Sequence, residues 1–161
     1  IGAPNQRASH QRFTFKYFRS FKNDVKLDFG YSYQNNKRKE FDIRRGGRTN
    51  IPVVDLLLKT HNLMLGFSNI KMENWDFEFG YNGLIQDNFS TPDTGVKRLI
   101  PDYIKLENGI YILGSYQESN SFLWEWGLRL DHVAYDAKKY YYKSNWEERN
   151  YDTLFLSLIH I

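Results

Sequence analysis

The sequence predicts an all-β protein, an antiparallel up-and-down meander of six to seven long strands. Apolar and polar residues alternate with a period of two through most of the chain, and short turn sequences join the alternating runs in pairs. No apolar run approaches the roughly 18 residues that a membrane-spanning helix needs. A membrane β-barrel remains open, because alternation dilutes its apolar residues.

The clearest pattern lies in the hairpin expected over residues 57–86. One apolar and one polar series alternate along both of its halves. The apolar series takes His61, Leu63, Leu65 and Phe67, and then Trp75, Phe77, Phe79 and Tyr81. The polar segment Asn69–Asn74 between the two runs predicts a turn.

Two further hairpins are expected over residues 12–34 and 103–135. Their turns are predicted at Lys22–Asp24 and Glu118–Ser121, where polar residues interrupt the alternation. All three hairpins therefore have short turns, and their strands exceed the usual length of about 5–6 residues.

Long loops are expected between and after the hairpins, over residues 35–55, 87–102 and 136–153. All three are rich in charge, and the first two also carry Gly and Pro. Loops of this length are uncommon in compact domains. Short turns on one side and long loops on the other are typical of outer-membrane barrels, where the loops are extracellular.

Residues 156–161 have two interpretations. Their sequence, Leu-Ser-Leu-Ile-His-Ile, resembles the translation of a transposon end used to prepare sequencing libraries, and would then be a scar. The alternation of Leu156 and Leu158 also fits a genuine strand start. Because the chain starts without Met or a signal peptide, we expect it to be a piece of a longer protein.

Composition gives weak evidence about partners. The formal net charge is +3, with both signs interspersed, and the chain contains no Cys. Disulfides and thiolate metal sites are therefore excluded. Because aromatic and basic residues fall on opposite faces of the strands, we expect no nucleic-acid partner.

The polar face has two possible environments. It could line a hydrated lumen, with the aromatic face in lipid, or form the solvent side of a soluble β-sandwich or lipocalin-like barrel. An open sheet edge cannot lie in hydrocarbon, so the lumen interpretation requires more strands than this chain supplies. The residues expected to face the lumen are Asp76, Glu78, Glu125, Arg129 and Asp131.

Three stretches resemble barrel segments of TonB-dependent outer-membrane receptors of the type abundant in Bacteroidetes. They are Tyr33–Asn36 with Lys39–Arg48, Pro92–Gly95 with Leu99–Tyr103, and Gly127–His132. In the last stretch Leu130 stands where the family commonly has Tyr. The resemblance covers residues from about 11 to 155.

This resemblance implies a closed barrel of roughly 22 strands with a separate plug domain. It implies a place in the Gram-negative outer membrane, among lipid and lipopolysaccharide, and energised uptake of a small-molecule ligand, such as a ferric siderophore in iron uptake. The partners would be the protein's own plug and the TonB complex, whose motifs this sequence lacks. No cofactor is expected.

The first expected loop, over residues 35–55, is the candidate ligand-contacting segment because it is rich in basic residues. In its stretch Lys37–Arg48, the residues expected to contact the ligand are Lys37, Arg44, Arg45 and Arg48. The planar Arg side chain suits carboxylate, catecholate or phosphate groups. A solvated loop contacting lipopolysaccharide, or Arg residues that join the barrel to the plug, would give the same pattern.

No motif predicts an enzyme, although an enzymatic outer-membrane barrel was considered as a third hypothesis. The Gly-x-Ser-x-Gly, phosphate-loop and dinucleotide patterns are absent, and Asp93-Thr94-Gly95 has no second copy to form an aspartic-protease dyad. His10, His61 and His132 lack metal-ligand spacing, so no metal site is expected beyond a weak surface pair at Asp131–His132.

Overall fold

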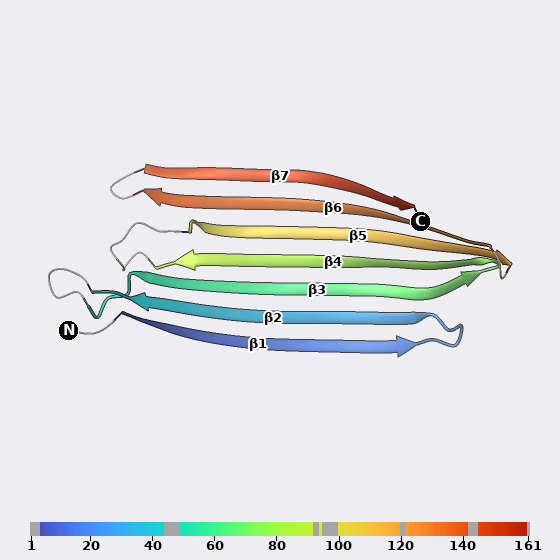
Figure 1. Ribbon diagram of the computed structural model, residues 1–161, viewed down its shortest axis with the longest axis horizontal. Helices are drawn as coiled ribbons and strands as arrows, with labels where there is room; N and C mark the ends of the chain where they lie inside the picture. Colours follow the sequence, from blue (N-terminus) through green and yellow to red (C-terminus); the bar gives the residue numbers. More distant parts are fainter. Residues whose placement is uncertain are drawn as a thin grey trace.

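The computed structural model describes residues 4–43, 49–91, 94, 100–119, 122–141 and 145–160. There the chain forms one antiparallel sheet whose seven strands lie side by side in sequence order (Figure 1). The predicted meander is therefore confirmed. The strands are β1 (Asn5–Ser20), β2 (Lys26–Phe41), β3 (Val54–Met72), β4 (Trp75–Ser90), β5 (Asp102–Ser119), β6 (Phe122–Tyr141) and β7 (Asn145–His160).

The strands are longer than the sequence pattern predicts. They run for 16 to 20 residues, and most of the additional length lies at the end where β2–β3, β4–β5 and β6–β7 connect. Segments expected as loops are strand over residues 35–41, 54–55, 87–90, 102, 136–141 and 145–153, and β1 begins at Asn5, before the first hairpin expected from residue 12. In these segments polar residues occur on both faces, so the period of two disappears although the backbone stays paired.

The expected loop over residues 136–153 is the largest correction. Backbone pairing between β6 and β7 continues through Asp136↔Asn150 to Tyr141↔Asn145. Only residues 142–144 separate the two strands. The strands expected to end at residues 34 and 135 instead continue to Phe41 and Tyr141.

The turn between β3 and β4 is also shorter than expected. It contains only Glu73 and Asn74, because the register shifts between Phe67 and Ile70 and β3 continues to Met72. Asn69 and Glu73 have positive φ angles of 59° and 54°. A bulge of this kind inserts an extra residue, and it returns Ile70 and Met72 to the apolar face.

The first predicted turn is confirmed at Lys22–Asp24. The Phe21 amide donates to the Val25 carbonyl over 2.8 Å, and the Asp24 amide donates back to the Phe21 carbonyl over 3.1 Å. Asp24 has a φ of 61°, a left-handed conformation that Asp tolerates better than most residues. The turn therefore closes with its own backbone hydrogen bonds.

One row of paired residues crosses all seven strands and serves as a reference. This reference row is Arg19, Leu27, Phe67, Phe79, Ile112, Leu128 and Leu158. Because directly opposed residues share a face, the register joins the apolar series of all strands on one side of the sheet. The predicted division into two faces is confirmed.

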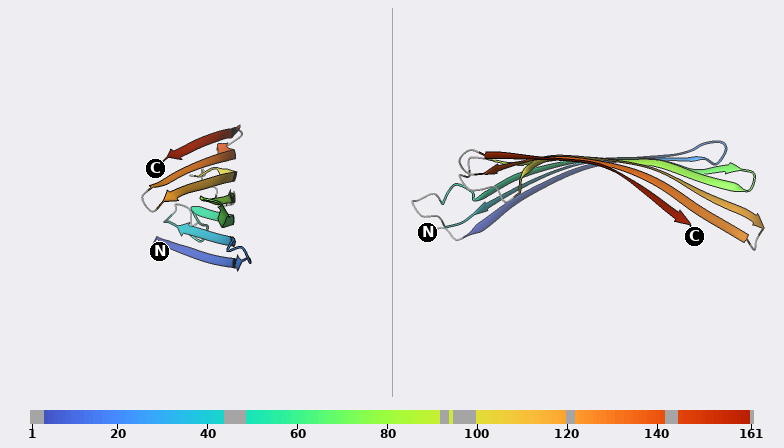
Figure 2. Two further views of the ribbon diagram at one scale, coloured as in Figure 1. Left: turned by 90° about the vertical axis from the view of Figure 1, so that its right-hand side faces the viewer. Right: turned by 90° about the horizontal axis from the view of Figure 1, so that it is seen from above.

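The sheet is a single twisted and curved layer with no second layer against it (Figure 2). Within the described ranges Ala137 is the one buried apolar residue, and no large side chain is completely buried. Apolar side chains such as Phe13 and Ile110 keep 57% and 55% of their surface exposed. The same ranges hold no helix that is long and apolar enough to cross a membrane.

Candidate functional site

The polar face of the sheet is its concave face. It surrounds a hollow of about 630 Å³ to which all seven strands contribute residues. The residues that line this hollow include one from each strand in order: Lys16, Ser32, Asn62, Asn82, Gly109, Arg129 and Phe155. The apolar series therefore occupies the convex face, and the concave face is the candidate functional surface.

All five residues predicted to face a lumen lie on this concave face. Arg129 and Asp131 line the large hollow. Asp76, Glu78 and Glu125 line a second hollow of about 390 Å³, nearer the short turns. The sequence pattern thus brought the five residues to one surface, although in two separate places.

Arg129 and Asp131 form a two-pronged ion pair in the larger hollow. Arg129 Nε donates to Asp131 Oδ2 over 2.7 Å, and Nη2 donates to Oδ1 over 2.6 Å. The two residues are neighbours on the same face of β6, since they are two positions apart. The pair fixes both side chains and largely cancels their charges at this point of the hollow.

Tyr111 links β5 to β4 across the concave face. Its hydroxyl donates to Glu78 Oε1 over 3.0 Å. Its ring lies against Gly80, where an added Cβ would be 2.7 Å from the ring. Gly80 therefore provides the space that the tyrosine ring fills. The alternation of the sequence did not predict this role, although Tyr111 is an aromatic residue within a polar series.

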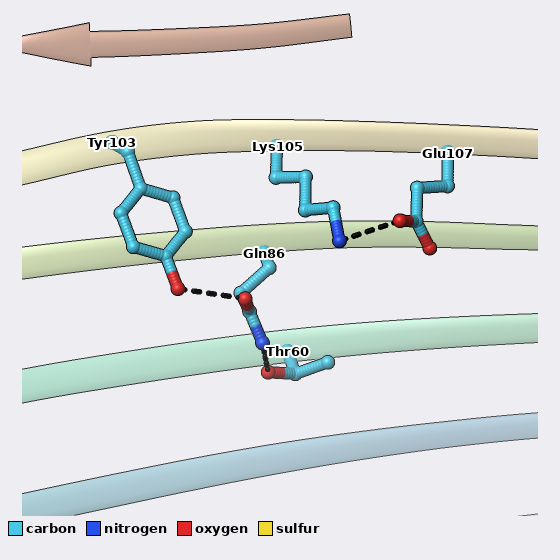
Figure 3. A network of polar contacts seen from close by, with 5 residues as sticks. All are labelled: Thr60, Gln86, Tyr103, Lys105 and Glu107. Atoms are coloured by element: carbon cyan, nitrogen blue, oxygen red, sulfur yellow. Dashed lines mark hydrogen bonds and ion pairs between the residues drawn. The ribbon is translucent and has the colours of Figure 1, made fainter. Parts of the chain in front are cut away.

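A polar network lies on the concave face, and one of its residues, Glu107, also lines the larger hollow. Figure 3 shows the five residues of the network from close by. The Tyr103 hydroxyl donates to Gln86 Oε1 over 2.7 Å, and Gln86 Nε2 donates to Thr60 Oγ1 over 3.1 Å. Lys105 and Glu107 form an ion pair of 2.5 Å beside it. The network joins β3, β4 and β5.

Tyr103 acts as a donor in this network. Burial raises the pKa of its phenol above 10.0, and the nearby Lys105 charge opposes this shift more weakly. Its ring also stacks on Tyr135 of β6, with 5.0 Å between centroids. Tyr103 therefore stays protonated at neutral pH and keeps its hydrogen bond to Gln86.

The connection between β4 and β5 is fixed at its base by buried polar residues. Asn88 Nδ2 donates to the Pro101 carbonyl over 2.9 Å, and the Ser90 amide donates to Asp102 Oδ1 over 2.7 Å. Asn88 and Ser90 are only 4% and 5% exposed. These contacts position the two ends of this connection beside the network around Tyr103.

Only one of the predicted ligand-contacting residues, Lys37, lies within the described part of the chain, and it does not line the hollow. Arg44, Arg45 and Arg48 lie outside the described residues. Lys37 pairs with Leu57 and belongs to the series of Tyr31 and Tyr33, so it lies on the convex face. Lys37 is therefore separated from the hollow by the sheet itself.

No metal centre is found in the described part of the chain, which holds no group of three or more potential ligands. The pair Asp131–His132 does not form even a weak site. Asp131 pairs with Arg129 on the concave face, while His132 Nε2 lies 2.9 Å from Asp152 Oδ1 on the convex face. Adjacent strand residues point to opposite faces.

Comparisons of the chain with models of known protein families, with characterised proteins and with solved structures gave no match. The class of protein is therefore defined by the fold and its two faces alone. It is an all-β, seven-stranded antiparallel meander with a polar concave face and an uncovered apolar convex face.

Proposed function

We propose that the chain is part of the wall of a TonB-dependent outer-membrane transporter, a closed barrel of roughly 22 strands. The whole protein takes up a scarce nutrient, with a ferric siderophore as the expected ligand. In this proposal the convex face contacts lipid and the concave face lines a hydrated interior that a plug domain fills. The proposal combines the resemblance of three sequence stretches with the properties of the two faces.

The observation that carries the proposal is a pair of aromatic clusters bounding the apolar convex face. Near the short turns, the Trp75 ring lies 5.0 Å from Tyr116 and 5.7 Å from Trp124. Near the connections, the His61 ring lies 4.8 Å from Tyr33. Membrane barrels have aromatic girdles in these positions, at both edges of an apolar band about 25 Å tall.

The distance between the clusters fits such a band. On β4 the apolar series runs from Trp75 to Ile85, which spans about 33 Å at the usual rise of a strand. A strand tilted by about 40° carries that length through about 25 Å of membrane. The strands then extend beyond the band on the connection side, as outer-membrane strands do toward the cell exterior.

The positions of the turns give the strand tilt independently. Relative to the reference row, β2 begins one residue beyond Leu27, β4 begins four residues beyond Phe79, and β6 begins six residues beyond Leu128. If all the short turns lie at the same height in the membrane, this height is five residues farther from the reference row on β6 than on β2, which is four strands away. With standard strand rise and spacing this corresponds to a tilt of about 40°, within the 35–45° range of membrane barrels.

Membrane placement can be tested by single-cysteine scanning, because the chain has no native Cys. Cysteines at positions 77, 79 and 81 of β4, and separately at 76, 78 and 82, are labelled with an environment-sensitive fluorophore in lipid vesicles. Labels at the odd positions should be quenched by nitroxide-bearing lipids, and labels at the even positions should not. Equal quenching in both series would contradict the proposed orientation.

The transport step needs a separate experiment in bacteria that carry the gene. Deleting the reading frame that contains this chain should abolish uptake of a radiolabelled ferric siderophore under iron limitation, and a plasmid copy should restore it. Unchanged uptake would exclude this ligand while leaving the membrane placement intact.

A soluble ligand-binding β-sandwich or lipocalin-like barrel is the alternative. It requires a second layer that covers the apolar residues, whereas the convex face of this sheet is open over the described strands. A chain that stays monomeric without detergent and protects its convex cysteines from a water-soluble thiol reagent would favour this alternative.

A further inference from the structure

Three cationic residues form a diagonal on the convex face, one on each of the first three strands. Arg7 on β1 is twelve residues from Arg19, Lys37 on β2 is ten residues from Leu27, and Lys59 on β3 is eight residues from Phe67. All three belong to the same alternating series as the residues of the reference row. We call Arg7, Lys37 and Lys59 the convex basic diagonal.

The diagonal follows the direction that the turns define. From each strand to the next, the diagonal moves two residues closer to the short turns. The position of the short turns moves in the same direction by slightly more than one residue per strand. At a tilt of about 40°, one residue contributes about 2.5 Å along the membrane normal. Successive members of the diagonal therefore differ in height by only about 2 Å per strand.

The convex basic diagonal lies just outside the apolar band. Lys59 is two residues beyond His61, and Lys37 is four residues beyond Tyr33. These separations place Lys59 about 5 Å above its neighbour His61 and Lys37 about 10 Å above its neighbour Tyr33 along the membrane normal. Lipid headgroups occupy this layer.

The charges of the diagonal have little internal compensation. Among the described side chains, neither Lys37 nor Lys59 takes part in an ion pair; Asp87, opposite Lys59 in the register, forms none with it. Arg7 lies directly opposite Lys39.

The neighbours of Arg7 leave its guanidinium available. Lys39 is neutralised by Asp55, whose Oδ2 lies 3.2 Å from Lys39 Nζ. The Arg7 guanidinium lies over the Phe41 ring, 5.2 Å from its centroid, on the exposed surface of β1. An aromatic ring beneath the guanidinium orients it without satisfying its hydrogen-bond donors.

We propose that Arg7, Lys37 and Lys59 bind the phosphate groups of anionic lipids in the outer leaflet. This inference rests on the proposed membrane placement of the convex face. Arg presents a fork that holds a phosphate through two hydrogen bonds, and Lys supplies a point charge. Lys37 thereby acts on the lipid side of the wall and not in the recognition of a transported ligand.

The test compares two double substitutions in the full-length protein that contains this chain. Lys37→Gln with Lys59→Gln removes two charges from the diagonal, and Lys16→Gln with Lys26→Gln removes two from the concave face. Tryptophan fluorescence measures partitioning into vesicles of phosphatidylcholine alone and of phosphatidylcholine with about 30% phosphatidylglycerol. The first variant should lose about 25-fold in partitioning into the anionic vesicles only, because each basic residue near such a surface contributes about fivefold.

Three results would overturn the inference. Equal losses for the two double variants would show a general effect of net charge, and no loss for Lys37→Gln with Lys59→Gln would show that the diagonal does not contact lipid. Competition by millimolar inorganic phosphate would assign the site to a soluble anion. Failure of the unsubstituted full-length protein to enter phosphatidylcholine vesicles would instead overturn the proposed function itself, which keeps the two failures distinguishable.

Discussion

The Tyr111 ring packs directly against Gly80 of the neighbouring strand. An added Cβ at Gly80 would lie 2.7 Å from both the ring and the Leu65 carbonyl oxygen. The nearby Gly66 is different, because the closest atom to an added Cβ there is the Tyr111 hydroxyl oxygen at 3.7 Å. Gly66 on β3 and Gly80 on β4 lie directly opposite each other. The space beside Gly80 is filled, whereas the contacts beside Gly66 have ordinary distances.

Gly80→Ala should therefore destabilise the sheet while Gly66→Ala should not. The added methyl group at Gly80 must displace the tyrosine ring and meets a backbone oxygen that cannot move away alone. Overpacking of this kind costs about 1–3 kcal/mol. Urea titration of the full-length protein folded in lipid vesicles measures both variants. A loss for Gly66→Ala as large as that for Gly80→Ala would show that the effect comes from the strand backbone and not from Tyr111.

Tyr103→Phe should lower the free energy of unfolding by about 1–2 kcal/mol. The substitution removes the hydroxyl that donates to Gln86 Oε1 and leaves this part-buried oxygen without its donor. Tyr135→Phe is the matched control, because Tyr135 stacks on the same ring and no hydrogen bond of its hydroxyl is found within the described residues. The same urea titration should show a change below about 0.5 kcal/mol for the control. Equal effects would assign the loss to ring packing.

The stability of the chain should fall as the pH rises through 10. Burial raises the pKa of Tyr103 above its ordinary value, so the folded chain holds this proton more tightly than the unfolded chain does. The contribution is complete below the unfolded pKa of about 10 and is lost above it, as the phenol ionises first in the unfolded state. Unfolding measured between pH 8 and 11 should show a shallower decline in Tyr103→Phe. Identical pH slopes would contradict this role for Tyr103.

The two faces were predictable from the sequence because one physical rule determines them. Strand side chains alternate, so counting by twos from Phe79 assigns Phe77 and Trp75 to one face and Glu78 and Asp76 to the other. The same count from Tyr33 places Lys37 on the convex face. The functional grouping of Lys37 with Arg44, Arg45 and Arg48 relied on their shared charge and did not apply this count.

The strand ends and the contacts between strands were not predictable in the same way. Beyond the apolar band both faces carry polar residues, such as Asn36, Arg38 and Asp136. The alternation that identifies a strand is therefore lost there. The contact of Tyr111 with Gly80 depends on the register, which reflects the bulge near Asn69 and the lengths of the turns. A single residue of slip would place Tyr111 on the other face relative to Gly80.

The proposed orientation predicts opposite responses to a lysine at two neighbouring positions. Ile110 lies on the convex face near the middle of the apolar band, and Asn82 lies in the adjacent row on the concave face, where it lines the larger hollow. A lysine at the lipid-facing midplane of a barrel costs about 2–4 kcal/mol, whereas one in a hydrated interior costs little. Ile110→Lys should therefore destabilise the full-length protein in lipid vesicles by about this amount, and Asn82→Lys should change the stability by less than about 0.5 kcal/mol. The cost of Ile110→Lys should also decrease in vesicles of shorter-chain lipids, because the lysine then lies closer to water. A cost that is independent of lipid length would indicate that protein, and not lipid, covers Ile110, as the soluble sandwich requires.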